Sequence, residues 1–563
     1  MFKDLFRSRA LPLFSLVALA CAGCSGAPEN ASPDAVEVEL GDDGLTSTSG
    51  VERPVQFSSY VYQPLNASDA AVSAAIAKQV KTALGALRSP KIGLRDRAAS
   101  NTMNPSKWTR ETVSVVGASS PSAPVAPVAP VAPAPQVQRV RFTYNDRAVV
   151  SRAYDRLSTS ALTLLFGDYE QKADLVRASC SDDRTSATDS LWYHFSPELT
   201  SCRTLQAAEA KRLANERKAL GPSLLKVGPE ELSRVFMPLT MKLGAAAQGS
   251  VSASPEYDRL YGVGTSRSTV QVHSFFGVDA DAASPDDALG REAVSFFRTM
   301  LRAMPGLRVV ATQPFAMLLD VFVDGAKVDG VTYDKLTGWI LAEEPFPTAL
   351  GTDAARILAF RKQCLEKLTE RAIDLSVPLT VSRNGQNGVA AERSLNIRFF
   401  YGYEDGTAEA RQKAQWRYLE AFWHGDVFLY NGHSHFGHGP LEPTAYSSAN
   451  FNDRYQLMLI NSCLSFNYYH DDFFAMKPGG TKNLDKIVNG LPSSVRGSGA
   501  VTAALLKGLF DGKQSTYTTL LGSMQSAASS QMDALRLVDG ELDNTFSQSK
   551  TPLTVVVRQA SPM

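Results

Sequence analysis

The sequence predicts an α/β protein whose C-terminal half contains a mostly parallel sheet, preceded by a smaller mixed α+β domain and a proline-rich linker. Three observations predict this fold. From about residue 265 onward, short apolar segments alternate with segments of helical periodicity. Residues 427–430 and 457–460 are apolar at every position, which is typical of strands buried on both faces. The chain of 563 residues is 44% hydrophobic and 20% charged, which suits a protein with more than one packed core.

The N-terminus has the anatomy of a lipoprotein signal peptide over residues 1–24. A basic start is followed by an apolar stretch that is too short to span a bilayer. The segment ends in Ala22-Gly23-Cys24 and resembles a bacterial lipobox, which makes Cys24 the expected lipidation site, although Cys21 stands where leucine is usual. An ordinary cleaved signal peptide with incidental cysteines is the alternative.

Export places the protein in an oxidising compartment, where disulfides form. We therefore expect a disulfide between Cys180 and Cys202, whereas Cys364 has the pattern of a core residue on a helix. Residues 25–50 are rich in acids and contain no Lys or Arg, so we expect an acidic tether. The tether would hold the protein on a lipid anchor in the bacterial cell envelope, at the periplasmic or outer-membrane face.

Four segments follow the tether. Residues 51–120 are a small N-terminal segment in which a helix is expected over 68–88. Residues 121–136 repeat Pro-Val-Ala and predict a semi-rigid polyproline II linker. Residues 137–264 give a mixed signal and predict a mixed α+β domain of unknown role, and residues 265–563 are the predicted α/β domain.

Within the α/β domain each expected element follows from its local pattern. The helix expected at 407–424 has Trp416, Leu419 and Trp423 on one face. Residues 481–489 are expected to form a loop or a short helix. The other expected elements are strands at 270–275, 307–311, 395–401, 427–430, 457–460 and 553–557, and helices at 286–304, 499–510 and 515–537.

Charge and hydropathy argue against a nucleic-acid partner and against a membrane-spanning helix. Lys+Arg and Asp+Glu both total 57, so the net charge is zero, whereas binding to a phosphate backbone relies on an excess of basic residues. We therefore expect no nucleic-acid partner. Beyond the N-terminus no apolar run reaches the length of a spanning helix, so we expect membrane attachment through the lipid alone.

Chemistry-bearing residues follow both of the wholly apolar strands. The first strand leads into a glycine-rich segment with His433, and the second leads into Cys463. If the two strands are parallel neighbours, both residues emerge at the same edge of the sheet. A free thiol has a pKa of about 8.5, and a nearby imidazole can take its proton and later protonate a leaving amine. The pattern therefore favours thiol catalysis.

The strand that ends in Tyr430-Asn431-Gly432-His433 and the next strand, which ends in Ser462-Cys463, together resemble the caspase-like superfamily of cysteine peptidases, in particular its gingipain-type branch. The resemblance covers about residues 395–510. It implies a three-layer α/β/α domain, endopeptidase activity on a protein or peptide substrate, and no required cofactor. A structural calcium ion is compatible with it.

The resemblance also implies a role for each matched residue. His433 would be the general base and acid, and Cys463 the nucleophile. The backbone N–H groups of Cys463 and of the region of Gly432 and Ser434 would form the oxyanion hole. The family usually has glycine after its histidine, where this chain has Ser434. This departure leaves open a catalytically inactive caspase-like lipoprotein that serves in surface binding or assembly. His438, which also precedes a glycine, is an alternative base.

A zinc site is the rival interpretation of the same histidines. His433-x-His435-x-x-His438 resembles the first ligand motif of the metallo-β-lactamase superfamily, and imidazoles at this spacing can share one zinc ion. That motif normally has aspartate directly before its last histidine, where this chain has Gly437. Under this alternative the protein would be a zinc-dependent hydrolase and Cys463 would have no catalytic role.

Overall fold

The computed structural model describes residues 44–95, 102–117, 135–247, 249, 252–277, 288–310, 319–332, 335–336, 338–339, 345–370, 372–383, 390–402, 408–469, 471–528 and 533–557. They all belong to one of the two compact units of the chain, Asp42–Met563. The expected signal peptide with Cys24, most of the acidic tether and nearly all of the Pro-Val-Ala linker lie outside the described residues. No helix in the described part of the chain is long and apolar enough to cross a membrane.

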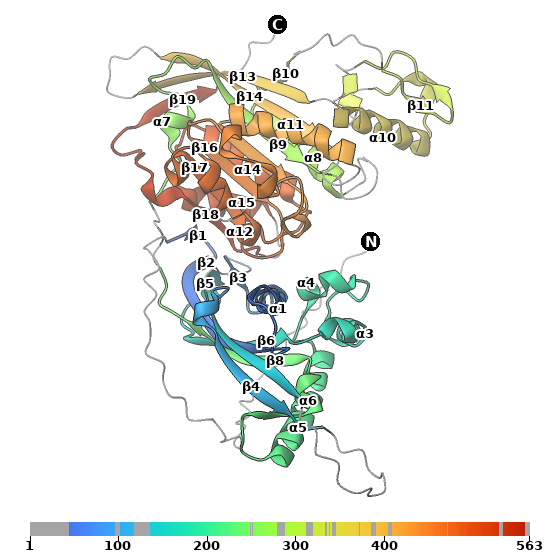
Figure 1. Ribbon diagram of the computed structural model, residues 1–563. Helices are drawn as coiled ribbons and strands as arrows, with labels where there is room; N and C mark the ends of the chain where they lie inside the picture. The colour runs from blue at the N-terminus through green and yellow to red at the C-terminus, as the bar shows by residue number, and fades with distance from the viewer. Residues whose placement is uncertain are drawn as a thin grey trace, which may run out of the picture. The chain divides into compact units, whose positions relative to one another are not determined.

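The larger of two main sheets has ten strands and takes in most of the C-terminal half (Figure 1). Its strands are β1 (Thr46–Ser47), β9 (Thr269–Phe276), β10 (Arg308–Val309), β13 (Ile373–Arg383), β14 (Ala391–Tyr401), β15 (Val427–Asn431), β16 (Gln456–Asn461), β17 (Leu484–Asn489), β18 (Arg536–Asp539) and β19 (Leu553–Val557). Their order is β1-β18-β17-β16-β15-β9-β14-β13-β10, and β19 pairs with β13. The five central strands, from β14 to β17, are parallel, and the strands outside them are antiparallel. The sheet is therefore mixed, with a parallel centre.

Helices pack against both faces of this sheet. They are α7 (Tyr257–Leu260), α8 (Ala288–Ala303), α10 (Ala354–Glu370), α11 (Ala408–His424), α12 (Ser465–Tyr468), α13 (Asp472–Met476), α14 (Ser498–Phe510) and α15 (Tyr517–Ala527). Val427 and Leu429 belong to one core together with α8, α14 and α15, whereas Phe428 and Tyr430 belong to the other core together with α11. Successive side chains of a strand point to opposite faces, so a strand between two cores is apolar at every position.

Three expectations for this half are corrected. Residues 484–489 form strand β17 and not a loop or short helix, and the charged pair Asp485-Lys486, both buried, hid the strand pattern. The helix expected over 515–537 ends at Ala527, and β18 begins at Arg536. Strand β13, which pairs with β14 over nine positions, was not predicted. A small hairpin is formed by β11 (Phe322–Val323) and β12 (Ala326–Lys327).

The second main sheet belongs to the N-terminal half. Its strands are β2 (Gly50–Gln63), β3 (Ile92–Leu94), β4 (Thr109–Val115), β5 (Gln136–Ser151), β6 (Thr159–Leu165), β7 (Lys226–Val227) and β8 (Phe236–Leu243). Long strands β2 and β5 pair from Gly50↔Ser151 to Gln63↔Gln138, and Figure 1 shows them curving beside α1 (Asp69–Lys81). The predicted segment 51–120 and the predicted domain 137–264 therefore share one sheet, and strands β1 and β2 begin within the expected tether.

The helices of the N-terminal half complete this domain. Besides α1 they are α2 (Ala83–Ala86), α3 (Ala173–Cys180), α4 (Leu191–His194), α5 (Thr200–Leu220) and α6 (Pro229–Leu232). The helix expected over 68–88 is divided into α1 and α2, and its predicted apolar stripe is buried: Val72, Ile76, Val80, Leu84 and Leu87. Cys180 and Cys202 form a disulfide, as the sequence predicts.

Candidate functional site

The two strands that carry the candidate residues are parallel neighbours in register. β15 and β16 pair from Val427↔Leu457 to Asn431↔Asn461. His433 and Cys463 each lie two residues beyond this last pair. The prediction that both residues emerge at the same edge of the sheet, from adjacent parallel strands, is confirmed.

A chain of buried asparagines fixes the carboxyl ends of three adjacent strands. Asn461 Nδ2 donates to Asn431 Oδ1 at 3.0 Å, and Asn489 Nδ2 donates to Asn461 Oδ1 at 3.1 Å. Thr502 Oγ1 on α14 also donates to Asn431 Oδ1, at 2.9 Å. Asn489 Nδ2 further donates to the carbonyl oxygen of Ser462, at 3.1 Å. Because buried polar groups hold each other in defined geometry, the residues that follow these strands leave the sheet from fixed positions.

Cys463 lies on a tight turn and is partly exposed. Its thiol donates to the carbonyl oxygen of Ser493 at 3.5 Å. The next residue, Leu464, has a φ of +51°, which reverses the chain into α12. Ser465 Oγ donates to the carbonyl oxygen of Ile460 at 2.7 Å and closes this turn. The other free cysteine of the described residues, Cys364, is buried as predicted, and burial raises the pKa of its thiol to about 12. Cys463 is thus the accessible thiol of this pair.

The histidine loop is anchored through its backbone. Tyr430 Oη donates to the carbonyl oxygen of His433 at 2.7 Å, and Tyr469 Oη donates to that of Ser434 at 3.2 Å. The rings of His433 and His435 lie 5.7 Å apart, centre to centre. His435 and Phe436 both have a positive φ, a backbone conformation that residues other than glycine rarely adopt. The loop backbone is therefore held in a specific bent shape at the sheet edge.

The zinc alternative is not supported by the arrangement of the histidines. Among the described residues, which include His433, His435 and His438, no three His, Cys, Asp or Glu side chains gather where they could hold a metal ion. His438 is instead largely exposed, and its Nδ1 lies 3.4 Å from Glu442 Oε1. The structure thus directs His438 toward a surface carboxylate, and His433 is the histidine nearer to the strand end.

A small pocket, with a cavity volume of about 20 Å³, lies near Cys463. It shares Ser493, whose carbonyl accepts the Cys463 thiol, and Asn461, which lies two residues before the cysteine. The lining contains two arginines and several neutral polar groups and no acidic residue. The lining residues are Asn461, Ser493, Ser494, Arg496, Gly497, Ser498, Val501, Gln525, Ala528, Ala534 and Arg536.

Arg536 on β18 is the buried cation of this pocket. Its Nη2 donates to Asn461 Oδ1 at 3.1 Å, and its Nε has no hydrogen-bond partner among the described residues. Burial lowers the pKa of Arg536 to about 10, although Asp533 opposes this shift. Asp533 Oδ1 itself accepts from Ser49 Oγ and from the N–H of Leu535, each at 2.9 Å. A buried cation is costly unless it is paired, so this pocket has the electrostatics of an anion site.

Sequence reasoning missed the asparagine chain, Ser493 and Arg536. A signal for two of the asparagines was present, because Asn431 and Asn461 each follow a wholly apolar strand and could have been found by aligning the two strand ends, whereas Asn489 ends a strand that the sequence did not predict. Arg536 had no such signal, because it falls in a region predicted as helix. Its role depends on strand β18 lying beside β17.

Comparison with known proteins gives no further support for an assignment. No family model, no curated protein and no solved structure matches this chain. The likeness to the caspase-like superfamily therefore rests on the residues at the two strand ends.

Proposed function

We propose that this protein is an exported, lipid-anchored cysteine peptidase of caspase-like type, in which Cys463 is the nucleophile and His433 is the general base and acid. The observation that carries the proposal is the register of β15 and β16. His433 and the partly exposed Cys463 each lie two residues beyond the last pair of these strands, Asn431↔Asn461. The parallel centre of the sheet and the two cores on its faces support a three-layer caspase-like arrangement.

The reaction would be amide hydrolysis through a thioester. His433 takes the proton of the Cys463 thiol, and the sulfur attacks the carbonyl carbon of the substrate, forming a C–S bond. His433 then gives the proton to the leaving amine as the C–N bond breaks. Water hydrolyses the thioester, which releases the carboxylic acid and restores the thiol. Backbone N–H groups at Cys463 and at the Gly432–Ser434 segment would stabilise the oxyanion.

The arginine-lined pocket would receive the substrate side chain next to the bond that is cut. A carboxylate in this pocket could accept hydrogen bonds from Arg536 and from Arg496 and would neutralise the buried cation. A neutral side chain of the same shape, such as an amide, would leave Arg536 uncompensated. We therefore propose a preference for an acidic residue at this position.

The test uses a peptide with an electrophilic group at its C-terminal end, directly after an aspartate. Labelling of Cys463 and hydrolysis of a matching fluorogenic peptide are expected for the wild type, and both are lost in Cys463→Ala. His433→Ala should reduce hydrolysis by at least about 100-fold. Matched controls are Cys364→Ala, at the buried thiol, and His438→Ala, at the histidine held by Glu442.

Two outcomes would count against the peptidase. A Cys463→Ala variant that still hydrolyses the peptide would exclude thiol catalysis by this residue. A folded wild type that neither labels nor hydrolyses any acidic, basic or neutral peptide would favour the inactive surface-binding alternative. Membrane attachment is tested separately, because Cys24→Ser should release the protein from the envelope fraction without changing its peptide hydrolysis.

A further inference from the structure

Two adjacent leucines project into solvent from the loop between α5 and β7. Leu224 and Leu225 are 55% and 54% exposed, the largest exposed fractions among the large hydrophobic side chains of the described residues. Val116, just after β4, is exposed as well, and its N–H donates to the carbonyl oxygen of Val227 at 2.8 Å. Helices α5 and α6 lie beside this end of the sheet (Figure 1). Val116, Leu224 and Leu225 therefore form one exposed apolar surface, the leucine tip.

The backbone of this loop is bonded to the rest of the domain. The carbonyl oxygens of five of the six residues 221–226 accept hydrogen bonds, three from Arg217, one from Arg139 and one from the N–H of Ser114. Because these carbonyls face the protein, the leucine side chains are held outward on a fixed frame. The acceptors are Gly221, Ser223 and Lys226 for Arg217, Leu224 for Arg139, and Leu225 for Ser114.

The surroundings of the leucine tip are positively charged. Lys218, in the last turn of α5, and Lys226, directly after the leucines, are exposed, and no Asp or Glu lies between them. The acids nearest to the tip along the chain are already bonded. Glu111 pairs with two arginines, Glu216 accepts from two N–H groups of α6, and Glu230 pairs with an arginine of α5. The tip thus combines apolar side chains with two lysines.

The size and charge of the tip favour a lipid surface over a protein partner. A stable interface between two proteins takes about 20–30 residues from each side, whereas the tip offers three apolar side chains and two lysines. Apolar side chains that enter the boundary of a bilayer, with cations at anionic headgroups, need no larger area. We propose that Leu224, Leu225 and Val116 insert into a bilayer surface that contains anionic phospholipid, with Lys218 and Lys226 at its headgroups.

The proposed lipid anchor and the leucine tip can reach the same bilayer. Strand β5 runs from Gln136, beside the end of β4, to Ser151, which pairs with Gly50 where the chain enters the sheet. Its 16 residues span roughly 50 Å at about 3.3 Å per residue. The chain between Cys24 and Leu45 can extend over about 70 Å. Its length is therefore sufficient for both contacts at once.

The contact would orient the protein on the membrane and would not replace the anchor. A few inserted side chains bind a bilayer weakly, and stable attachment takes a second signal. The inference goes beyond the proposed peptidase and takes from that proposal only the lipid at Cys24. It gives a role to the domain of residues 137–264, which the sequence left without one.

The test measures vesicle binding of the full chain with Cys24→Ser, so that no lipid is attached. This parent protein is expected to co-sediment with phosphatidylglycerol–phosphatidylethanolamine vesicles. Leu224→Ser/Leu225→Ser should lower its partition coefficient by at least about tenfold. Lys218→Gln/Lys226→Gln should lower it by about tenfold on these vesicles and leave it unchanged on phosphatidylcholine alone.

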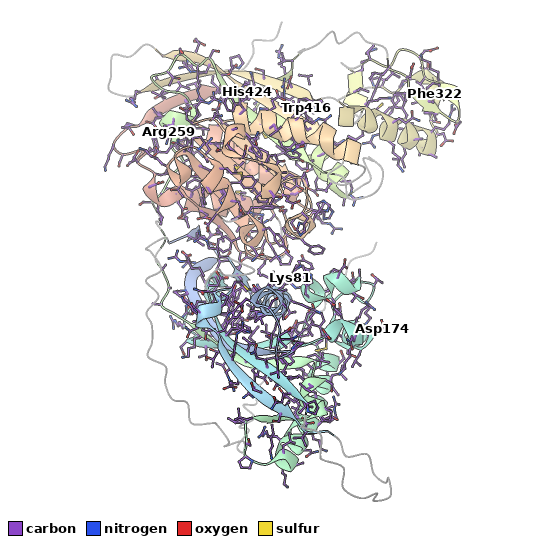
Figure 2. The ribbon with its side chains drawn as sticks, in the orientation of Figure 1. Lys81, Asp174, Arg259, Phe322, Trp416 and His424 are labelled. Atoms are coloured by element: carbon purple, nitrogen blue, oxygen red, sulfur yellow. A yellow bond between two sulfur atoms is a disulfide. The ribbon has the colours of Figure 1, made fainter. Side chains whose placement is uncertain are left out.

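The matched control replaces two leucines of similar exposure elsewhere in the domain. Leu157 is 45% exposed, and Leu175 is 46% exposed beside Asp174, which is labelled in Figure 2. Leu157→Ser/Leu175→Ser should bind vesicles as the parent does. Retention of the Cys180–Cys202 disulfide and an unchanged free energy of unfolding in urea show that each variant is folded.

Four outcomes would overturn the inference. They are absence of binding by the parent to the anionic vesicles, equal binding by the leucine variant, loss in that variant of a dimer that the parent forms, and faster proteolysis of its Pro-Val-Ala linker without vesicles. The third would identify a second copy of the chain as the occupant, and the fourth the linker. Peptide hydrolysis should be equal in all these variants, so failure of the peptidase and failure of vesicle binding are observed separately.

Discussion

The two edges of the parallel strands both carry buried polar side chains, but these are used in different ways. At the edge where the strands begin, two of them bond to the backbone. Asp426, just before β15, accepts from the N–H of Gln271 at 2.8 Å. Gln456, the first residue of β16, donates to the carbonyl oxygens of Ala421 at 3.0 Å and of Gly425 at 2.8 Å. These bonds fix the end of α11 to the sheet.

The same edge contains a buried carboxyl group that is surrounded by donors. Asp485, the second residue of β17, accepts from Tyr455 Oη at 2.6 Å and from Tyr517 Oη. Asn544 Nδ2 donates to the same oxygen at 2.6 Å. Burial raises the pKa of Asp485 to about 7 in spite of these bonds, which act in the opposite direction. Asp485 and the two tyrosines are buried, so the cluster supports the fold.

At the opposite edge the buried asparagine chain is equally enclosed, but it leads outward. Cys463 follows it and is partly exposed, and Arg536 bonds to it and faces a pocket. The comparison teaches that burial of polar groups alone does not distinguish a structural site from a functional one. The distinguishing features are a reactive group within reach of solvent and a buried charge to which no carboxylate of the described residues is bonded.

The largest expected effect tests the charge at the carboxyl edge. Arg536→Met should lower kcat/KM for a peptide with aspartate in the pocket by about 100-fold or more, while the matching asparagine peptide changes little. The free energy of unfolding should stay the same or rise, because a buried guanidinium is replaced by an apolar group. Arg454→Met, at the amino edge, is the matched control, since Arg454 bonds to the main chain of His424. Unfolding of Arg536→Met would show that Arg536 is structural.

The second effect tests the amino edge. Asp485→Leu should lower the free energy of unfolding by about 3 kcal/mol, because buried tyrosine hydroxyls lose their shared acceptor. Urea unfolding measures this loss. Asp485→Asn retains an acceptor and should cost less than about 1 kcal/mol. The alkylation rate of Cys463 in both folded variants should equal that of the wild type. A matching fall in this rate would contradict the separation of the two edges.

The third effect is the pH dependence of stability that the buried His273 causes in the middle of the sheet. His273 on β9 is buried, neither ring nitrogen has a hydrogen-bond partner among the described residues, and burial lowers its pKa to about 3. Arg398 and His424 act in the same direction, and Asp374 opposes them. The unfolded chain binds a proton at His273 below a pH of about 6.5 and the folded chain does not, so stability is lost as the pH falls. The loss from pH 7 to pH 5 should be about 2 kcal/mol.

His273→Phe should remove this part of the pH dependence, as measured by urea unfolding at the two pH values. Asp485 provides the control of opposite sign. Its folded pKa lies above the unfolded value of 3.8, so its contribution is present at low pH and is lost as the pH rises toward 7. Asp485→Asn should therefore increase the fall in the free energy of unfolding between pH 7 and pH 5, whereas His273→Phe should reduce it. Equal slopes in the two variants would reject both assignments.

The sequence predicted the parts of the fold that depend on local pattern. Strands β15 and β16 were found because residues 427–430 and 457–460 are apolar throughout, and the parallel arrangement followed from the intervening elements. Strand β17 was missed because Lys486 is buried in it, and its Nζ donates to the carbonyl oxygen of Tyr469 at 2.7 Å. A lysine satisfied by a distant carbonyl cannot be recognised in the sequence. The pairing of β2 with β5 was missed because some 70 residues, including the proline-rich linker, separate the two strands in the sequence.

The candidate site was predictable where it depends on order along the chain. His433 and Cys463 follow consecutive strands of the predicted sheet, and the structure places those strands side by side. Arg536 was not predictable, because it reaches the site from a part of the chain that no local pattern connects to it. Its contribution depends on the tertiary packing that places β18 beside β17.

The smallest effect concerns helix α11, where the face that carries Trp416 and Trp423 is half exposed. Trp423 is 48% exposed, whereas its neighbour Phe422 is buried and stacks on Phe451 with ring centres 4.7 Å apart. Trp416, labelled in Figure 2, is likewise half exposed. The tryptophans recur at helical spacing and share one face of α11, but the face that packs on the sheet is the adjacent one, with Tyr418, Ala421 and Phe422 buried.

Trp423→Ala should therefore lower the free energy of unfolding by only about 1 kcal/mol, whereas Phe422→Ala should lower it by about 3–5 kcal/mol, as for a fully buried aromatic residue. Urea unfolding of the two adjacent variants measures the difference on one helix. Alkylation of Cys463 should be the same in both folded proteins, because α11 ends at the amino edge of the sheet, away from the thiol. If Trp423→Ala cost as much as Phe422→Ala, the face of α11 that packs on the sheet would be the one that carries the tryptophans.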